Sequence, residues 1–458
     1  MKIVCWSLII VCFGAVQFSF GQPGTLDRTF GKEGVVDFDV EGVERLNIRK
    51  IAFDQNGKLV VAGEARVEGN LDTDLFFARF NADGTIDETF GKDGQGFVSF
   101  ALPAESEDFV FGLGLQSTGK IVFAANSKIG DNCTVVVGRL RMDGTPDESF
   151  HANSDRAYVE LFSYQPIFEV YDWSGILSID ESDEIFVGHT AFWEHRYLKL
   201  RPDGELDFNF GSNGQLEFQN PDVYGLEYPM AMSRLSDHSM LFCVGADFFD
   251  PKTNSSTGES FLFKLNGSGD FVSFGTNKNQ FPGFGFVDQS NFVFDVVATD
   301  EKIFVAGFLG VLFPGTISGF MAGMDLNGLS DPEFGNGGVI ALDEESSIVR
   351  KLLFDSKGNL YGVGTRRLQG VWASAVFAIK VLPTGQLDLD FGDQGLADPI
   401  EIFSGNGDRD FVMAPDDKIY IVSTSGDATL SMVRVSVGPV LGDVNRDNVV
   451  NLFDINPF

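Results

Sequence analysis

The sequence predicts an all-β protein that folds as a seven-bladed β-propeller of four-stranded repeats, each about 60 residues long. A nine-residue motif, Leu-Asp-Arg-Thr-Phe-Gly-Lys-Glu-Gly at 26–34, returns as Ile-Asp-Glu-Thr-Phe-Gly-Lys-Asp-Gly at 86–94. Its phenylalanine recurs at steps of 60, 60, 60, 64, 60 and 57 residues, at Phe30, Phe90, Phe150, Phe210, Phe274, Phe334 and Phe391. Phenylalanine is also abundant, with 47 residues against 8 tyrosines, which suits aromatic anchors packed between sheets. Near-constant spacing of one motif indicates a repeat architecture.

Each repeat is expected to hold four short strands. In the first repeat an apolar run at 35–38 follows the motif, two β-type runs flank Asn56-Gly57, and a further run covers 74–80. Asn-Gly between β-type runs favours a tight two-residue turn, because both central positions need positive φ. A second turn at Asp83-Gly84 leads into the next motif. Groups of four short strands, repeated along the chain, are typical of propeller blades.

The repeats are expected to close into a ring, with the last blade packed against the first. A linear array would leave exposed sheet edges and would need distinct caps, which the sequence does not contain. The predicted blades cover 35–80, 95–142, 156–202, 214–265, 280–326, 338–382 and 395–436.

The motif residues are predicted to have structural roles. Phe30 and its equivalents would fill the space between neighbouring blades, and Asp27 and Thr29 would bond local backbone N–H groups in the turn. Six copies keep the aspartate, at Asp27, Asp87, Asp147, Asp207, Asp331 and Asp388. The alternative interpretation is a ring of carboxylates that binds cations.

The motif and the hairpin between its copies identify a family resemblance. Leu-Asp-x-Thr-Phe-Gly-x-x-Gly, with an Asn/Asp-Gly-Lys hairpin about midway to the next copy, resembles the bacterial delta-60 repeat family across about 24–436. The resemblance implies a secreted β-propeller and no agreed activity. Two copies depart from the motif: His151 follows Phe150, and the fifth copy reads Gly-Asp-Phe-Val-Ser-Phe-Gly at 269–275.

Residues 1–21 are predicted to be a cleaved signal peptide, so the protein is expected to be secreted, either extracellular or at the cell surface. Lys2 precedes a largely apolar run at 3–16, and Ser19 and Gly21 are small residues at the usual −3 and −1 positions. The alternative is a membrane anchor, for which the run is short. No later segment is predicted to span a membrane. The net charge of −33 would repel phosphate backbones, which excludes nucleic-acid binding and is compatible with attraction for divalent cations.

The cysteines predict no disulfide framework. Cys5 and Cys12 lie in the signal segment, and Cys133 and Cys243 fall in different blades. We therefore expect two buried free thiols in the propeller, 22–437, and stability from packing alone.

The last segment, 438–458, has the ligand spacing of a calcium loop. Oxygen ligands stand at positions 1, 3, 5, 9 and 12, with a backbone carbonyl at position 7: Asp443, Asn445, Asp447, Asn451, Asp454 and, for the carbonyl, Val449. This pattern is similar to half of a type I dockerin. The resemblance implies calcium as a cofactor and a cohesin-like protein as a partner. A dockerin has two such loops, which leaves open a longer natural chain or a single functional loop. The alternative is a solvated acidic tail.

No catalytic or cofactor-binding residues are assigned within the propeller. His189 and His195 are not placed to bring two imidazoles onto one metal. His195 is interpreted as a surface residue on a strand, with a binding patch near Trp193 as the alternative. The sequence contains no Gly-x-Ser-x-Gly elbow and no phosphate loop. Neighbouring acids, at 105–108 and 344–345, are expected to be solvated, although a glycosidase pair elsewhere stays open.

The predicted function is a non-enzymatic binding scaffold that takes an extracellular polysaccharide or a cell-envelope component. Two alternatives remain: a secreted polysaccharide-degrading enzyme or accessory subunit with a dockerin-like tail, and a surface-layer protein held together by calcium. An enzyme would show two acids converging in the central channel. A binding module would show an exposed aromatic platform on one face, and a surface-layer protein would assemble when calcium is added.

Overall fold

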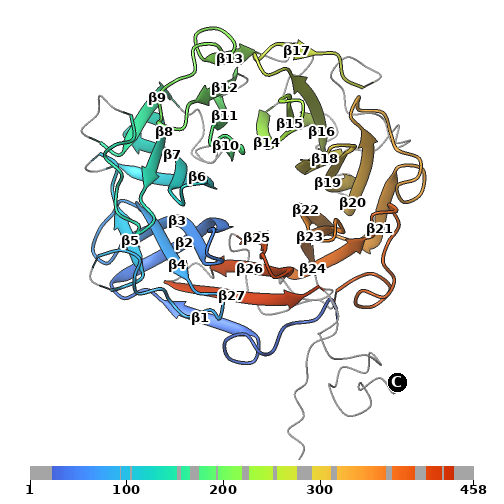
Figure 1. The fold of residues 1–458 in the computed structure, drawn as a ribbon, viewed down its shortest axis with the longest axis horizontal. Coiled ribbons are helices and arrows are strands. Elements are labelled where there is room, and N and C mark those ends of the chain that lie inside the picture. The colour runs from blue at the N-terminus through green and yellow to red at the C-terminus, as the bar shows by residue number, and fades with distance from the viewer. Residues whose placement is uncertain are drawn as a thin grey trace, which may run out of the picture.

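The fold was analysed in a computed structural model, which describes most of the repeat region. The described residues are 23–92, 94–103, 106–151, 156–165, 175–191, 194–218, 226–250, 255–275, 291–310, 317–367, 374–397, 409–424 and 428–437. The predicted signal segment 1–21 and the predicted calcium loop 443–454 lie outside them. The strands form seven sheets arranged radially as the blades of a ring (Figure 1). The chain is therefore a seven-bladed β-propeller, as predicted.

The blades are numbered here from their innermost strand. Blade 1 holds β2 (Val43–Phe53), β3 (Leu59–Val67), β4 (Asp74–Phe80) and β5 (Phe97–Phe100), and blade 2 holds β6 (Glu107–Leu115), β7 (Ile121–Ile129), β8 (Asn132–Leu140) and β9 (Tyr158–Tyr164). Blade 3 holds β10 (Gly175–Ile179), β11 (Ile185–Ala191), β12 (Glu194–Leu200) and β13 (Gln215–Phe218), and blade 4 holds β14 (Leu226–Arg234), β15 (Met240–Asp250), β16 (Ser255–Leu265) and β17 (Phe271–Val272). Blade 5 holds β18 (Asn291–Ala298), β19 (Lys302–Gly310), β20 (Ile317–Asp325) and β21 (Val339–Glu345). Blade 6, within the described residues, holds β22 (Ser347–Phe354), β23 (Leu360–Arg367) and β24 (Ser374–Val381), and blade 7 holds β25 (Arg409–Met413), β26 (Lys418–Thr424), β27 (Thr429–Ser436) and β1 (Val35–Asp39).

The predicted blade boundaries are wrong by one strand. The run after the first motif, β1, does not join β2 but pairs antiparallel with β27, with Val35 opposite Val433 and Asp39 opposite Thr429. Likewise the run after the second motif, β5, is the outer strand of blade 1 and pairs with β4. A motif therefore leads the chain to the outer edge of the blade just built, before it crosses to the centre of the next. The ring is closed because the N-terminal strand completes the last sheet.

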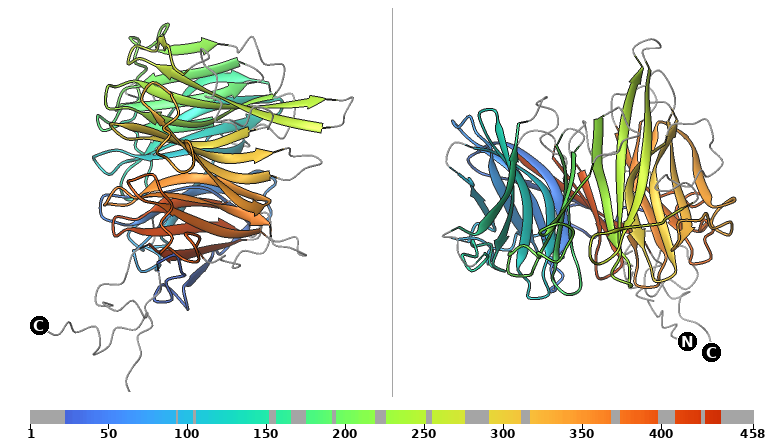
Figure 2. Two further views of the ribbon diagram at one scale, coloured as in Figure 1. Left: turned by 90° about the vertical axis from the view of Figure 1, so that its right-hand side faces the viewer. Right: turned by 90° about the horizontal axis from the view of Figure 1, so that it is seen from above.

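The two faces of the ring carry different connections. We call "motif face" the face with the first hairpin, 54–57, and the motif at 86–94, and "loop face" the opposite one, with the connections 68–73 and 101–106. The described ends of the chain meet on the motif face, where the Gly24 N–H donates to the Ser436 carbonyl at 2.7 Å. On the loop face, the hairpin of β15 and β16, with 11 residues in each strand, projects beyond the other blades (Figure 2).

All seven motif phenylalanines are buried, with exposed fractions of 0–1%. Phe30 packs in one core cluster with residues of blade 1 and blade 7, including Leu59 and Met432, and its ring meets the Tyr420 ring edge-on at 5.3 Å. Phe90 packs in the same way between blades 1 and 2. The prediction that these rings fill the spaces between blades is confirmed.

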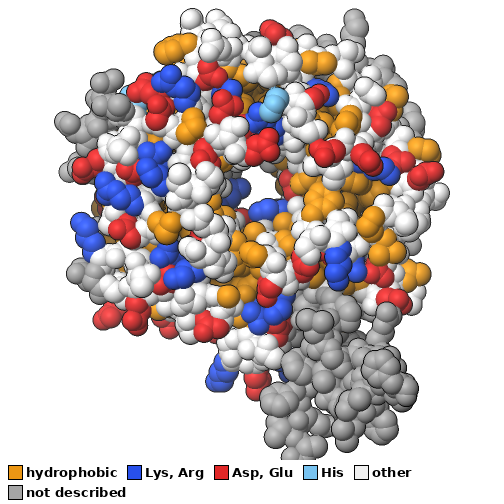
Figure 3. Space-filling model, in the orientation of Figure 1, with side chains coloured by type: hydrophobic (Ala, Val, Ile, Leu, Met, Phe, Trp, Pro, Cys, Tyr) orange, Lys and Arg blue, Asp and Glu red, His pale blue; other side chains and the backbone are white. Residues whose placement is uncertain are grey.

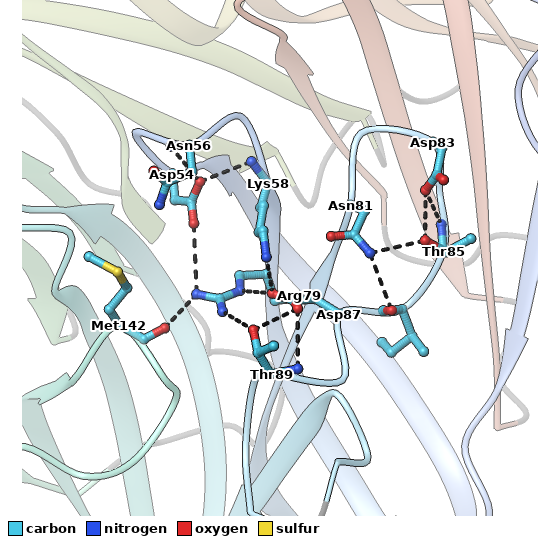
Figure 4. Close-up of polar contacts among 11 residues, drawn as sticks. Asp54, Asn56, Lys58, Arg79, Asn81, Asp83, Thr85, Asp87, Thr89 and Met142 are labelled. Atoms are coloured by element: carbon cyan, nitrogen blue, oxygen red, sulfur yellow. Dashed lines mark hydrogen bonds and ion pairs between the residues drawn. The ribbon is translucent and has the colours of Figure 1, made fainter.

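The motif aspartates bond local backbone, as predicted, and each also pairs with a basic side chain. Asp87 Oδ1 accepts from the Thr89 N–H at 3.2 Å, and Asp87 Oδ2 accepts from Arg79 Nε at 2.6 Å and Lys58 Nζ at 2.8 Å (Figure 4). Arg79 also donates to the Met142 carbonyl in the next blade, and its guanidinium lies 5.0 Å from the Phe90 ring centroid. One arginine thus joins the motif of its own blade to the turn of the next.

The alternative of a cation-binding carboxylate ring is wrong. The six aspartates each have their own protein cation, in the pairs Asp27–Arg434, Asp87–Arg79, Asp147–Arg139, Asp207–Lys199, Asp331–Lys302 and Asp388–Lys380. Among the described residues, no group of three or more His, Cys, Asp or Glu is arranged to hold a metal ion.

Two further expectations concern the cysteines and the membrane. Cys133 and Cys243 are buried free thiols, as predicted. Within the described ranges, no helix has the length and apolar character needed to cross a bilayer.

Candidate ligand site in the central channel

The innermost strands carry a recurrent irregularity. In β2, β6, β14, β18 and β22 the register with the second strand shifts by one residue near the middle of the strand. Such a β-bulge leaves one residue unpaired and redirects its side chain. The unpaired residues are Arg49, Phe111, Met230, Phe294 and Arg350. Since these strands border the centre of the ring (Figure 1), the bulges act on the wall of the channel.

In the five bulged strands, pairing resumes three residues before the strand ends, and the same position can be followed in the regular inner strands β10 and β25. On blades 5, 6, 7 and 1 this place is held by Asp295, Lys351, Asp410 and Lys50, so that charge alternates around half of the ring. We call these four residues the charge belt. On blades 2, 3 and 4 the same place is held by uncharged residues, Gly112, Ile176 and Ala231. At this position, charged residues are therefore confined to blades 5, 6, 7 and 1.

The acids of the charge belt tie neighbouring blades together. Asp410 Oδ1 accepts from Lys351 Nζ at 2.7 Å, and Asp410 Oδ2 accepts from the Ile51 N–H at 2.9 Å. Asp410 thus contacts both blades beside its own. Asp295 Oδ2 accepts from the Leu352 N–H at 2.7 Å, across to blade 6, and its Oδ1 accepts from the Val296 N–H at 3.0 Å.

Burial shifts the pKa values of two residues of the charge belt. Burial raises the pKa of Asp295 to about 6, against the opposing hydrogen bond from the Leu352 N–H and the charge of Lys351. Burial lowers the pKa of Lys50, while the nearby Asp410 carboxylate acts in the opposite direction. Both shifts have the direction expected of charges held in a poorly solvated wall.

One residue nearer the loop face, three of these four blades, blades 6, 7 and 1, present arginines. We call Arg49, Arg350 and Arg409 the arginine row. Arg49 is neutralised by Glu64, with Nη2 2.6 Å from Oε1. Arg350 is exposed, donates to Thr365 Oγ1 at 3.3 Å, and its guanidinium lies 5.2 Å from the Phe294 ring centroid.

Arg409 is half-buried beside this group. Burial and then the charge of Arg350 lower the pKa of Arg409. Figure 3 shows the central opening in the space-filling view, with basic and acidic side chains on its wall.

His195 is not at the surface, so the surface interpretation is wrong. His195 on β12 and His189 on β11 are both fully buried. His195 Nδ1 lies 2.8 Å from Thr190 Oγ1. His189 is enclosed by aromatic rings, and burial lowers its pKa to about 3.

The neighbouring acids that were predicted to be solvated differ in their exposure. Glu107 is exposed, as predicted, but Asp108 is fully buried and accepts from the Leu102 N–H at 2.8 Å. Burial raises the pKa of Asp108 to about 6. The predicted calcium ligands, Asp443 to Asp454, lie outside the described residues, so the calcium loop stays a prediction.

The site in the channel was missed at the sequence level. Charged pairs precede the apolar end of three inner strands, as Arg49-Lys50, Arg350-Lys351 and Arg409-Asp410. The equal position of these pairs in the repeat was the sequence signal that could have identified the site.

Comparison with known families supports a β-propeller family. The family described as "Domain of unknown function (DUF5122) beta-propeller" matches residues 55–90 and 116–150, which cover parts of two repeats. No curated protein matches the sequence significantly.

Solved structures resemble the chain at low sequence identity. A protein of unknown function from Dyadobacter fermentans has a TM-score of 0.43 and 10% identity, over 88% of this chain and 100% of that chain. An ulvan lyase of polysaccharide lyase family PL25 has a TM-score of 0.46 and 8% identity, over 89% of this chain and 99% of that chain. Drosophila Semaphorin 2a has a TM-score of 0.47 and 8% identity, over 92% of this chain and 77% of that chain.

Proposed function

We propose that the protein is a secreted or cell-surface binding scaffold, without catalytic activity, that takes an extracellular polysaccharide or a cell-envelope component. The observation that carries this proposal is the clustering of the charge belt and the arginine row on the inner strands of four neighbouring blades. A rigid ring that presents a small number of placed polar groups suits recognition of a polar ligand. The protein surface as a whole is strongly acidic, so this local cluster of basic groups is set apart from it.

The engagement of the channel acids favours binding over catalysis. Asp295 and Asp410 each use both carboxylate oxygens to accept hydrogen bonds from the protein's own donors. An acid held in this way stabilises the ring, whereas a general acid or base must reach the proton that it transfers.

The second candidate is a secreted polysaccharide-degrading enzyme, and one observation favours it. A carboxyl group with a pKa of about 6, as in Asp295, lies in the range useful for general acid catalysis near neutral pH. This candidate requires the Asp295 carboxyl to exchange its backbone donors for substrate.

The predicted calcium loop would complete the scaffold. Its ligands, Asp443, Asn445, Asp447, Val449, Asn451 and Asp454, would hold one calcium ion beyond the propeller. A cohesin-like partner is the interaction that its dockerin-like spacing suggests.

A binding screen of residues 22–458 tests the proposal. The protein is incubated with polysaccharides and cell-envelope fractions, in calcium and then in chelator, and both retention and released sugar are measured. We expect retention without released sugar, and loss of retention in chelator would assign the tail a part in binding. Released sugar that disappears in the Asp295→Asn variant would establish the enzyme instead.

A further inference from the structure

We infer that Lys50, the last residue of the charge belt, is a reactive amine that captures an aldehyde from the channel as an imine. In this step the Lys50 nitrogen attacks the carbonyl carbon, the C=O bond becomes a C=N bond, and the carbonyl oxygen leaves as water with both amine protons. The inference goes beyond the proposed function, because it assigns a covalent site and a carbonyl compound as the class of ligand.

The other three residues of the charge belt each contact the blade that follows their own. Asp295 accepts a hydrogen bond from the Leu352 N–H of blade 6 at 2.7 Å. Lys351 Nζ donates to Asp410 Oδ1 of blade 7 at 2.7 Å, and Asp410 Oδ2 accepts from the Ile51 N–H of blade 1 at 2.9 Å. Side chains at this position therefore reach forward around the ring.

This series of contacts stops at Lys50. The same position in the following blade is Gly112, and a Cβ added there would lie 2.4 Å from Leu177 Cβ, so no acidic side chain fits. In the preceding blade, both carboxylate oxygens of Asp410 are already engaged by Lys351 and Ile51. Within the described ranges, the Lys50 side-chain nitrogen accordingly has no ion pair and no hydrogen bond.

Lys50 is accessible from the channel. It follows the bulge of β2, a strand that borders the centre of the ring, and it is partly exposed. The central opening is visible in the space-filling view (Figure 3). A small aldehyde can therefore reach the amine without any movement of the blades.

The surroundings of Lys50 favour the uncharged form of its amine. Burial has the largest effect and lowers the pKa of Lys50. The cations Lys351 and Arg49 act in the same direction, whereas the carboxylates of Asp410 and Asp295 oppose it. Only the unprotonated amine attacks a carbonyl carbon, and lysines that form imines are typically desolvated or close to another cation.

Lys351 provides a contrast at the equivalent position of another blade. Its side chain is 31% exposed, but its nitrogen is held by the Asp410 carboxylate at 2.7 Å. An ammonium in such an ion pair must give up its partner before the nitrogen can attack a carbonyl carbon. The two lysines thus differ in whether the blade ahead supplies a carboxylate.

The test traps the imine by reduction. The folded chain is incubated near neutral pH with limiting propanal and cyanoborohydride, which reduces the imine to a secondary amine, and labelled lysines are quantified by peptide mass spectrometry. Lys351 is the ion-paired control, and Lys357, exposed in a hairpin turn, is the surface control. The Lys50→Arg variant identifies the peptide that carries the label. The urea-unfolded chain gives the labelling rate of each lysine without tertiary structure.

In the folded chain we expect Lys50 to be labelled about tenfold faster than Lys357 and Lys351, and in urea we expect similar rates for all three. Labelling of Lys50 at or below the rate of Lys357 in the folded chain would overturn the inference. So would a preference for Lys50 that persists in urea, because it would come from local sequence and not from the channel. The polysaccharide screen measures retention without aldehyde or reducing agent, so failure of the proposed function is distinguishable from failure of this inference.

Discussion

Arg434 and Asp27 lie 407 residues apart in the sequence and meet in a buried ion pair, with Arg434 Nε 2.9 Å from Asp27 Oδ2. The same guanidinium donates to the Ala82 carbonyl at 3.0 Å and lies 4.7 Å from the Phe30 ring centroid. Arg79 makes the equivalent contacts with Asp87, Met142 and Phe90 where blade 1 meets blade 2. The joint that closes the ring thus uses the same chemistry as the joints between successive blades.

Loss of the closing arginine should destabilise the fold. Arg434→Met removes the nearest cation of the buried Asp27 carboxylate and leaves Lys418, 3.5 Å away, and the hydrogen bonds from Thr29, so we expect a loss of roughly 3 kcal/mol in the free energy of unfolding. Urea denaturation measures it. The control is Arg156→Met, which removes an exposed pair with Glu160 and should cost about 1 kcal/mol or less. Similar losses in the two variants would contradict a closing role for Arg434.

Each motif phenylalanine is expected to contribute strongly to the free energy of unfolding. Phe90 is fully buried, and we expect Phe90→Ala to lower the free energy of unfolding by roughly 3–5 kcal/mol, because it leaves a cavity between two blades. Phe208, which is 70% exposed on the motif face, supplies the control, and Phe208→Ala should change stability little. A measured loss well below this range for Phe90→Ala would exclude its role as an anchor.

Alanine substitutions at two glycines distinguish the stability cost of backbone strain from the cost of disturbed packing. Gly144 and Gly57 both have positive φ, +82° and +72°, but a Cβ on Gly144 would lie 2.7 Å from Phe90 Cζ, whereas a Cβ on Gly57 would meet nothing within 4 Å. Gly57→Ala should cost roughly 1–2 kcal/mol from strain alone. Gly144→Ala should cost clearly more, because the Phe90 ring must move. Equal costs in chemical denaturation would show that this turn does not pack on the ring.

Two kinds of aspartate make opposite contributions to the pH dependence of stability. Although burial opposes it, hydrogen bonds from Lys58, Thr89 and Arg79 lower the pKa of Asp87. A depressed carboxyl pKa gives stability that is present above the unfolded pKa, roughly 4, and is lost at lower pH. Burial raises the pKa of Asp295 and Asp108 to about 6, so the folded state keeps protons that the unfolded chain has lost. These two groups lower stability as pH rises from about 4 to about 6, whereas His189, whose pKa burial lowers to about 3, raises stability over the same range.

Urea denaturation of the wild type and of Asp295→Asn between pH 3 and pH 8 isolates the contribution of Asp295. The variant should gain stability relative to the wild type as pH rises from about 4 to about 6, and the acid limb should be the same in both. A stability difference that stays constant over this range would contradict the raised pKa of Asp295.

The C-terminal segment should bind calcium. Calorimetric titration of residues 22–458 is expected to show one site, because the oxygen ligands of the loop have the spacing that wraps a single ion. Asp443→Ala combined with Asp454→Ala should abolish it, whereas Glu88→Ala, an exposed acid in the propeller, should not. A silent titration at millimolar calcium would remove the loop assignment.

The channel illustrates why a site can escape sequence reading. Alternation of apolar and polar residues predicts which side of a strand is buried, but a bulge shifts that alternation by one residue. Arg350 stands at such a bulge, and its stacking partner Phe294 belongs to another blade. His189 escaped for a related reason, since the rings that enclose it come from β6 and β9 of the preceding blade.

The sequence by itself determined the repeat, the number of blades, the turns and the buried place of each motif phenylalanine. These features depend on residues a few positions apart, such as the Asp87 carboxylate and the Thr89 N–H, or on a spacing that returns along the chain. Only the tertiary structure decided that β1 completes the last blade, that Arg434 closes the ring, and that charged side chains of four blades meet on one half of the channel. Those relationships join residues tens to hundreds of positions apart, and they depend on strand pairing and register, which local pattern does not specify.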